Sequence, residues 1–360
     1  MRNINKPLKE DQQHIKEDWF STQLLAWYDI NKRDLPWRET KDPFKVWLSE
    51  IILQQTRVNQ GLPYYQKFTN SFNSVKEFAS ADLDVILKLW QGLGYYSRAR
   101  NMHKCAIMVV EDYSGLFPSN YLELQKLKGV GKYTAAAIAS ICFNERVPSV
   151  DGNVFRVLSR LFGMTEDIAK GSSFKVYFEK AKSLMPINEP GDFNQALMEF
   201  GATMCIPKSP KCGDCMFAKH CFAKQHRMID VLPVKSKTVK IKHRYFNYRV
   251  FTYDDRVLMR QRKPGDIWTG LFEFDLQETE KSLKRSNFVE AKLRQSSGEI
   301  VHQLTHQKLH IQFQVFELES NEAWQKLKEE KQMKEILVGE IGDYAVPKPI
   351  ELFFNNEFCQ

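Results

Sequence analysis

The sequence lacks the features that would place the chain in a membrane or in a secreted, disulfide-bonded class. Its longest apolar stretch, residues 135–143, is far shorter than the roughly 20 residues that a membrane-spanning helix needs. The N-terminus is polar and charged, so it lacks the apolar segment of a signal peptide. The cysteine count of seven is odd, which disfavours a fully paired disulfide framework. We therefore expect no membrane partner and a reducing compartment, the cytoplasm.

The composition is that of an ordinary globular protein, without internal repeats or low-complexity tracts. A chain of 360 residues with 43% hydrophobic and 27% charged residues is long enough for two or three domains. The formal net charge is +8, and it is unevenly spread: residues 1–224 carry +6, residues 225–244 carry +5 and residues 245–360 carry −3. Such a surplus is compatible with a polyanionic partner but does not establish one.

The apolar spacing changes along the chain and predicts two domains of different class. Residues 19–204 have helical spacing, interrupted by glycine and proline. Two segments further on, at 248–255 and 310–318, alternate aromatic or β-branched residues with polar ones, as strands do. We predict an N-terminal tail at 1–18, a helical domain at 19–224, a basic linker at 225–244, a mixed α and β domain at 245–352 and a C-terminal tail at 353–360.

Four of the seven cysteines lie within 17 residues, with the spacing Cys205-x6-Cys212-x2-Cys215-x5-Cys221. Four thiolates in one compact loop can surround zinc or ligate an iron–sulfur cluster. The number of sulfurs alone favours zinc, so the spacing is the specific part of this pattern. It resembles the [4Fe–4S] loop of the helix-hairpin-helix DNA glycosylases.

A short segment around Val130 predicts a contact with phosphate. Gly129 and Gly131 flank this residue, and a run of small residues that predicts a helix follows. The two glycines allow a sharp bend and a close approach of the backbone to a partner. The unpaired N–H groups at the start of the helix can then bind an anion.

Two carboxyl groups are candidates for acid–base chemistry. Glu50 is the single charged residue in the apolar run 46–53, and desolvation there would raise its pKa, as suits a proton donor at neutral pH. The alternative is a solvent-facing residue of an amphipathic helix. Asp151 precedes a predicted helix, where aspartate is a common N-cap. One carboxylic acid and one carboxylate also form the pair that cleaves glycosidic bonds.

Taken together, these residues resemble the adenine DNA glycosylases of the MutY type, which belong to the superfamily of endonuclease III. The resemblance is dense over residues 20–225 and weaker over 245–350. It implies a mostly α helix-hairpin-helix glycosylase fold with an iron–sulfur loop, followed by an α+β MutT-like (Nudix-fold) domain. The stretches that carry it are residues 33–38, 47–56, 91–100, 129–133, 150–154 and 193–197, and the four cysteines.

The resemblance implies the reaction and its residues. A monomer would act on duplex DNA at 8-oxoguanine:adenine or guanine:adenine mispairs, in the nucleoid if the source is bacterial. It would flip the adenine out and hydrolyse its N-glycosidic bond. Glu50 would protonate adenine at N7, Asp151 would stabilise the sugar oxocarbenium ion, and Tyr133 and Asn153 would position the two carboxyl groups. A [4Fe–4S] cluster would be bound by Cys205, Cys212, Cys215 and Cys221.

The resemblance also implies three sets of binding residues. The pocket for the flipped adenine would be lined by Arg33, Trp37, Arg38, Leu53 and Gln195. The DNA contacts would be Gln55, Thr56, Leu93 and Tyr95, and the backbone of Gly129, Val130 and Gly131. Recognition of 8-oxoguanine would fall to Leu304, Thr305 and His306. Here Leu304 replaces the family's aromatic residue and Thr305 its serine.

Other readings remain open at this point. Bifunctional enzymes of the endonuclease III type place a lysine where this chain has Tyr133, and a phenol cannot form the imine that strand cleavage requires. We therefore expect base excision without an efficient lyase step. The alternatives are a bifunctional glycosylase/lyase for oxidised pyrimidines, a noncatalytic sensor of DNA lesions, and a regulator held together by zinc.

Overall fold

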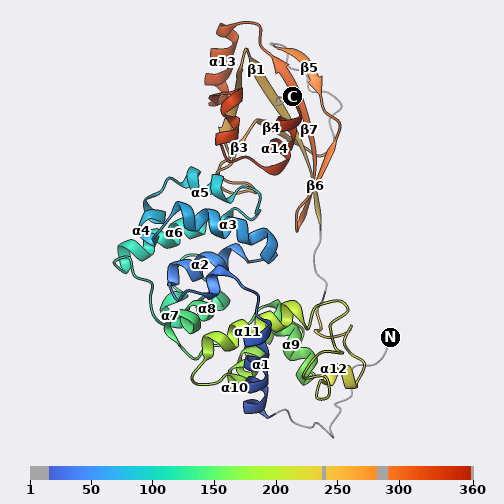
Figure 1. Cartoon of the computed structure of the whole chain (residues 1–360). Coiled ribbons are helices and arrows are strands. Elements are labelled where there is room, and N and C mark those ends of the chain that lie inside the picture. The colour runs from blue at the N-terminus through green and yellow to red at the C-terminus, as the bar shows by residue number, and fades with distance from the viewer. Residues whose placement is uncertain (1–15, 237–240, 282–290, 358–360) are drawn as a thin grey trace. The chain divides into compact units, whose positions relative to one another are not determined.

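The computed structural model describes residues 16–236, 241–281 and 291–357 (Figure 1). The chain divides into two compact units. The first comprises residues 1–54 and 111–237, and the second comprises residues 55–110 and 238–360. In the part of the chain that the structure describes, no helix is both long and apolar enough to cross a membrane.

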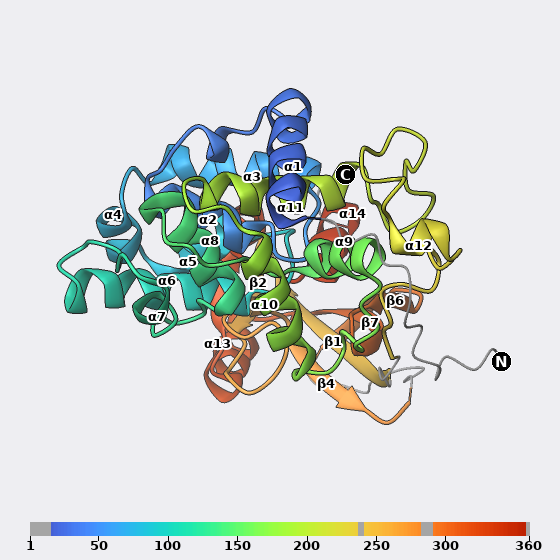
Figure 2. The ribbon, with the colours of Figure 1, turned by 90° about the horizontal axis from the view of Figure 1, so that it is seen from below.

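The first unit is helical, with α11 at its centre. α11 contacts α1, α8 and α9, and α2 packs against α8; Figure 2 shows α1 and α11 side by side. Phe20, Phe193 and Phe217 are fully buried in its core. Its elements are α1 (Glu17–Asn31), η1 (Pro36–Arg38), α2 (Pro43–Ile52), α7 (Tyr121–Leu124), α8 (Lys132–Phe143), α9 (Gly152–Phe162), α10 (Ser173–Leu184), α11 (Pro190–Thr203) and α12 (Phe222–Gln225).

Local sequence explains where the helices of the site begin and end. Asp42 caps α2 by accepting from the Phe44 backbone N–H, and Pro43 occupies the first turn, where a missing N–H costs nothing. Asp151 caps α9 in the same way. Gly163 ends α9 in the left-handed conformation, at φ +69°, which glycine adopts without a steric penalty.

The second unit combines a helical segment with the sheet. The helices are α3 (Val58–Ser71), α4 (Val75–Ser80), α5 (Leu83–Trp90), α6 (Ser97–Asp112, whose last two residues belong to the first unit), α13 (Asn321–Lys331), η2 (Val338–Asp343) and α14 (Lys348–Glu357). The strands are β1 (Lys242–Tyr253), β2 (Arg256–Gln261), β3 (Phe272–Glu273), β4 (Asp275–Thr279), β5 (Lys292–Ser296), β6 (Ile300–Gln303), β7 (Gln307–Glu317) and β8 (Lys334–Leu337).

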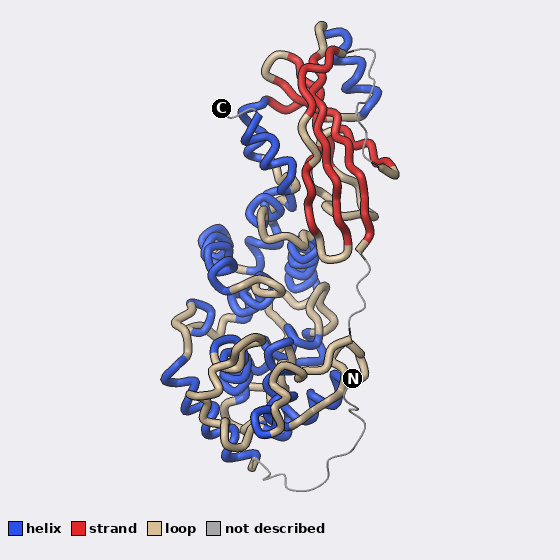
Figure 3. Tube along the Cα trace, turned by 90° about the vertical axis from the view of Figure 1, so that its right-hand side faces the viewer, coloured by secondary structure: helices blue, strands red, loops and turns tan. Residues whose placement is uncertain are grey.

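The strands form one sheet around the long parallel pair of β1 and β7 (Figure 3). The central order is β3-β2-β1-β7-β5, while β4 pairs with β1, β6 with β7 and β8 with β2. Tyr245 lies opposite His310 in the parallel register. Phe246, Phe313 and Ile350 are buried on the face that α14 covers. β6 and β7 form an antiparallel hairpin, and its turn carries residues 304–306.

The predicted change from helices to strands is confirmed. The exact segment boundaries stay a prediction, because parts of the predicted tails and linker (1–15, 237–240 and 358–360) lie outside the described residues. Within the described part of the linker, β1 already begins at Lys242. Residues 55–110 belong to the same compact unit as the sheet, which periodicity along the chain does not reveal.

Candidate active site

Glu50 lies on α2, on the side that faces α8 and the start of α9. Its side chain is half-buried between fully buried neighbours, Ser49 and Ile51. The pKa of Glu50 is raised to about 7, mainly by burial and to a smaller extent by the nearby Asp151 carboxylate. A hydrogen bond with Tyr133 and the charge of Arg38 act in the opposite direction. At neutral pH the group is therefore poised between proton donor and carboxylate.

The Asp151 carboxylate is held by hydrogen bonds at the start of α9. One carboxylate oxygen accepts from the backbone N–H groups of Asn153 at 2.9 Å and Val154 at 2.8 Å, and the other accepts from the Asn153 side-chain amide at 2.8 Å. Burial raises the pKa of Asp151, while these hydrogen bonds and the Arg156 charge oppose the rise. The helix cap suggested by the sequence is therefore present, and the role of the same carboxylate in a reaction stays a prediction.

Tyr133 and Asn153 connect the two carboxyl groups to the surrounding helices. The Tyr133 hydroxyl is hydrogen-bonded to Glu50 and also donates to the Met198 sulfur at 3.0 Å. Asn153 accepts from Arg156 at 2.8 Å through its side-chain oxygen. The structure therefore brings together all four residues that the sequence predicted to be catalytic, from α2, α8 and the start of α9.

Arg33 and Arg38, two of the predicted pocket residues, converge on a residue that sequence analysis missed. Glu199 of α11 accepts from Arg33 Nε at 2.7 Å, from Arg33 Nη2 at 2.6 Å and from Arg38 Nη2 at 2.7 Å. The signal was present, since Glu199 is a lone acid in the apolar segment 196–201, as Glu50 is in its own.

The other predicted pocket residues lie on neighbouring elements. The Tyr28 hydroxyl of α1 donates to Gln195 Oε1 at 3.2 Å, and the Arg38 guanidinium lies over the Tyr28 ring. Trp37 is buried in η1, and Leu53 is half-buried at the end of α2. Gln195, like Glu199, is on α11, so that helix contributes two polar groups to this region.

A sharp turn forms at the segment that was predicted to bind phosphate, and the binding itself stays a prediction. Gly129 has φ +80°, a conformation that other residues rarely adopt, and Gly131 is the N-cap of α8. Val130 is buried beneath the turn. Lys132, the first residue of α8, is exposed and its ammonium lies 5.0 Å from the centre of the Phe174 ring. The Lys132 ammonium is therefore engaged by an aromatic ring of α10.

The predicted DNA-contacting residues of the second unit differ in exposure. Gln55 is exposed and adopts φ 57°, and Thr56 is half-buried. Tyr95 is 47% exposed, as a wedge that enters a base stack would be. Leu93 is 6% exposed, so in this structure it packs against the protein.

The predicted recognition residues form the turn between β6 and β7. Thr305 and His306 are exposed, and Leu304 packs partly against the core of the sheet. The Leu304 backbone N–H donates to the Gln307 carbonyl at 2.8 Å, which closes the turn. Within this unit the hydroxyl groups of Tyr95 and Thr305 are hydrogen-bonded to each other. Two residues that are 210 positions apart, and were predicted to act on the same base pair, are thus in contact.

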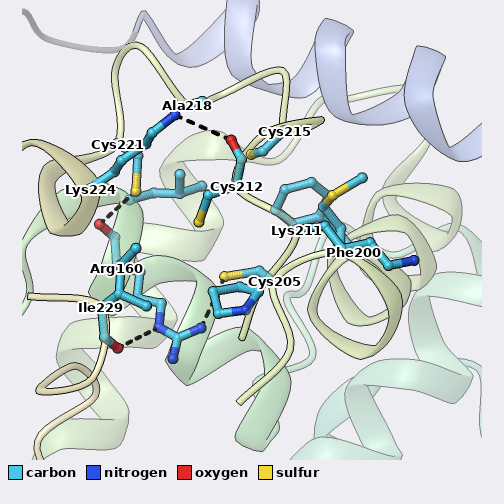
Figure 4. A pocket seen from close by; sticks show the side chains of 13 residues that line it. Arg160, Phe200, Cys205, Lys211, Cys212, Cys215, Ala218, Cys221, Lys224 and Ile229 are labelled. Carbon is cyan, nitrogen blue, oxygen red and sulfur yellow. Dashed lines mark hydrogen bonds between the residues drawn. The ribbon is translucent and has the colours of Figure 1, made fainter. Parts of the chain in front are cut away.

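The four clustered cysteines line one cavity of about 360 Å³, part of which is open to solvent (Figure 4). Figure 4 shows the Cys205, Cys212 and Cys221 sulfurs directed into the same space. Arg160 is 3% exposed and stabilises the loop around the cavity. Its guanidinium donates to the carbonyls of Ile206 at 2.7 Å and Pro207 at 2.9 Å. The Arg160 carbonyl accepts from the Cys221 thiol. Arg156 donates to the Cys205 carbonyl at 2.7 Å.

The donor set of this cavity fits a cationic group bound by thiolates. The pKa of Cys215 is raised to about 11, mainly by burial and in part by the other three cysteines, whose thiolates would repel its own. Bound iron would offset that repulsion and deprotonate the thiols. Within residues 16–236, 241–281 and 291–357, no group of three or more His, Cys, Asp or Glu side chains is placed to hold a metal ion. The fit therefore rests on the cavity and its sulfurs.

Two family models match the chain in the order of its two predicted domains. Residues 48–181 match the HhH-GPD superfamily base excision DNA repair protein, and residues 247–356 match the NUDIX domain. The predicted fold class is confirmed by these matches together with the helical and sheet content of the structure.

Relatives with known names support the same assignment. The adenine DNA glycosylase of Buchnera aphidicola subsp. Schizaphis graminum is 34% identical over 297 residues, which is 81% of this chain and 86% of the relative. That of Rattus norvegicus is 42% identical over 215 residues, 57% of this chain and 42% of the relative. A solved thermostable thymine-DNA glycosylase superposes with a TM-score of 0.54 at 31% identity, over 58% of this chain and 97% of that one.

Proposed function

The chain belongs to the adenine DNA glycosylase family, and on that basis we propose that it is a base-excision repair enzyme that hydrolyses the N-glycosidic bond of adenine mispaired with 8-oxoguanine or guanine. The observation that carries this proposal is the pairing of Glu50 on α2, whose pKa is raised to about 7, with Asp151 at the start of α9. A protein that only senses lesions needs neither group. The substrate is duplex DNA, and the enzyme acts on it as a monomer in the cytoplasm.

The reaction follows from the protonation states of these two residues. The Glu50 carboxyl donates its proton to adenine N7, so the C1′–N9 bond breaks with its electron pair leaving on a neutral base. The Asp151 carboxylate stabilises the oxocarbenium ion that remains on the sugar. Glu50, now ionised, accepts a proton from the water that attacks C1′, which restores the acid form. Tyr133 and Asn153 hold the two carboxyl groups in place.

The flipped adenine lies in a pocket lined by Arg33, Trp37, Arg38, Leu53 and Gln195. Extruding a base costs a few kcal/mol, and a mispaired adenine costs least. Gln55, Leu93 and Tyr95 wedge into the base stack near the opposite base, and Thr56 contacts that base. The turn formed by Leu304, Thr305 and His306 distinguishes 8-oxoguanine from guanine.

The experiment that tests the proposed function measures adenine release from duplexes that carry adenine opposite 8-oxoguanine, guanine or cytosine. We expect release opposite 8-oxoguanine and guanine and little opposite cytosine. Glu50→Gln should abolish release while DNA binding persists. Glu179→Gln, an exposed substitution on α10, is the matched control and should behave as wild type. Unchanged turnover of Glu50→Gln would contradict the assignment.

Cys205, Cys212, Cys215 and Cys221 are proposed to hold a [4Fe–4S] cluster, which supplies a rigid, charged anchor for the loop between α11 and α12. Purified protein should be yellow-brown, with about four irons per chain. Cys215→Ser should lose the colour and most of the iron, whereas Cys142→Ser, outside the cavity, should keep both. A colourless protein that contains zinc instead would exclude the cluster.

A further inference from the structure

The ion pairs of Glu199 are an arrangement that the mechanism above does not use. Glu199 is 1% exposed and, besides the three side-chain hydrogen bonds already described, accepts from the Arg33 backbone N–H at 3.2 Å. Burial acts to raise the pKa of Glu199, but the hydrogen bonds from Arg33 and Arg38 outweigh it and lower the pKa to about 2. Glu199 is therefore ionised at every pH at which the enzyme works.

The charge of Arg38 also acts on a second carboxyl group, that of Glu50. Arg38 ends η1, which packs against α2, the helix that carries Glu50. The Arg38 charge already acts on Glu50 and lowers its pKa, although burial dominates. An opposite charge in direct contact stabilises a carboxylate and lowers its pKa by about one to three units. A full ion pair between Arg38 and Glu50 would thus remove the proton that the proposed reaction needs.

The surroundings of both carboxyl groups determine where this guanidinium lies. Tyr133, Asp151, Arg38 and Cys142 are the titratable groups whose charges are coupled to Glu50. Of these four groups, Arg38 is the one that carries a positive charge. Around Glu199 lie Arg33, Arg38 and Tyr28, and Asp192 is close enough to act on Tyr28. Arg38 is further fixed by a hydrogen bond from Nη1 to the Arg33 carbonyl at 2.9 Å and by the Tyr28 ring.

We propose that Glu199 is a positioning residue that holds the Arg38 guanidinium against α11 and so prevents it from forming an ion pair with Glu50. The two carboxyl groups compete for one cation, and the buried, permanently ionised one retains it. Glu50 then keeps its proton for the substrate, while Arg33 and Arg38 are held ready to line the pocket. This inference rests on the proposed function, since it concerns the proton donor of that reaction.

The test is the pH dependence of single-turnover adenine release from an 8-oxoguanine:adenine duplex. In Glu199→Gln, Arg38 is free to pair with Glu50, so the decline of rate at high pH should begin about one pH unit lower than in wild type. The rate at pH 7.5 should then fall about tenfold, with a smaller loss at low pH. Asp192→Asn, an exposed carboxylate removed from the same helix, is the matched control and should leave the profile unchanged.

Two further variants separate positioning from packing. The double variant Glu199→Gln/Arg38→Gln removes the competing cation and should return the decline to the wild-type pH or above, even though pocket contacts are lost. Glu199→Asp keeps the charge and should keep the pH of the decline. If Glu199→Gln fails to fold, as circular dichroism would show, Arg38→Gln alone still tests the proposal, because the decline should then move to higher pH.

The outcomes are distinguishable from failure of the proposed function. A uniform loss of rate in Glu199→Gln at all pH values, or a double variant whose decline stays at low pH, would overturn the positioning role. If wild type releases no adenine, or if Glu50→Gln remains active, the proposed function itself fails. A third outcome would refute this inference alone. Wild type would release adenine in a way that depends on Glu50, but the pH at which the rate declines would be the same in Glu199→Gln as in wild type.

Discussion

At the scale of single residues, the environment of Glu50 links activity to stability. The pKa of a free glutamate is near 4.5, and burial raises that of Glu50 to about 7. Between these two values the folded protein binds a proton that the unfolded chain does not. The free energy of unfolding therefore decreases as pH rises through this window, and the contribution is present in full only below it.

Replacing this carboxyl group should stabilise the protein at high pH. Glu50→Gln cannot ionise, so we expect its free energy of unfolding to exceed that of wild type by on the order of 2 kcal/mol at pH 8 and by little at pH 4.5. Urea unfolding at the two pH values measures the difference. Equal stability of the two proteins at pH 8 would show that Glu50 is not desolvated in the folded state.

We predict that Tyr133 is the reason why strand cleavage does not follow excision. A lysine at this position would place an amine beside Glu50 and Asp151, where it can attack C1′ and form a Schiff base. Tyr133→Lys should therefore yield a protein–DNA adduct that borohydride traps, and wild type should not. Lys132 is held over the Phe174 ring, so Tyr133→Lys/Lys132→Ala should trap equally well. Trapping that requires Lys132 would contradict the assignment.

At the scale of elements, Asp151 at the start of α9 is a helix cap and is also the carboxylate proposed to take part in the reaction. Asparagine caps helices about as well as aspartate, whereas alanine costs about 1 kcal/mol. Asp151→Asn should thus unfold like wild type within about 0.5 kcal/mol, and Asp151→Ala should lose about 1 kcal/mol.

Both variants should excise adenine slower by roughly 10²–10³-fold, because the charge that stabilises the oxocarbenium ion is gone. Asn120→Ala removes the cap of α7 and should reduce stability without reducing the single-turnover rate. A fully active Asp151→Asn would limit Asp151 to its role as a cap.

Much of this element-level organisation could be predicted from local sequence. The glycines around Val130 predicted the turn, the apolar run around Glu50 predicted its burial, and Asp151 before a predicted helix suggested the cap. The partners of Arg33 and Arg38 could not be predicted, because Glu199 is more than 160 residues away along the chain. Burial of Leu93 was likewise decided by packing, since this residue lies between two glycines and is nevertheless 6% exposed.

At the scale of the whole molecule, the chemistry and the proposed recognition of the opposite base belong to different units. Glu50 and Asp151 lie in the first unit, and residues 304–306 lie in the second. Changes in the recognition turn should therefore alter the choice of substrate more than the chemical step.

Thr305→Ala removes an exposed hydroxyl from this turn. We expect the ratio of excision opposite 8-oxoguanine to excision opposite guanine to fall roughly 3- to 10-fold, the size of one lost hydrogen bond. Leu304→Phe, which restores the family's aromatic residue, should raise the ratio. Thr252→Ala, whose hydroxyl donates to Phe316 elsewhere in the same sheet, is the control. If the ratio is unchanged in both Thr305→Ala and Leu304→Phe, this turn does not recognise the opposite base.

The amino-acid sequence by itself determined the two fold classes and the choice of the proposed reacting groups, because a carboxyl group in an apolar run, a glycine turn and a cysteine spacing are local patterns with local physical causes. Only the tertiary structure decided which charges meet. Glu199 and Glu50 are both lone acids in apolar segments, yet one is held ionised by two guanidinium groups and the other has its pKa raised to about 7. The free energy of a buried charge depends on the partner that folding brings to it, and that partner comes from a distant part of the chain.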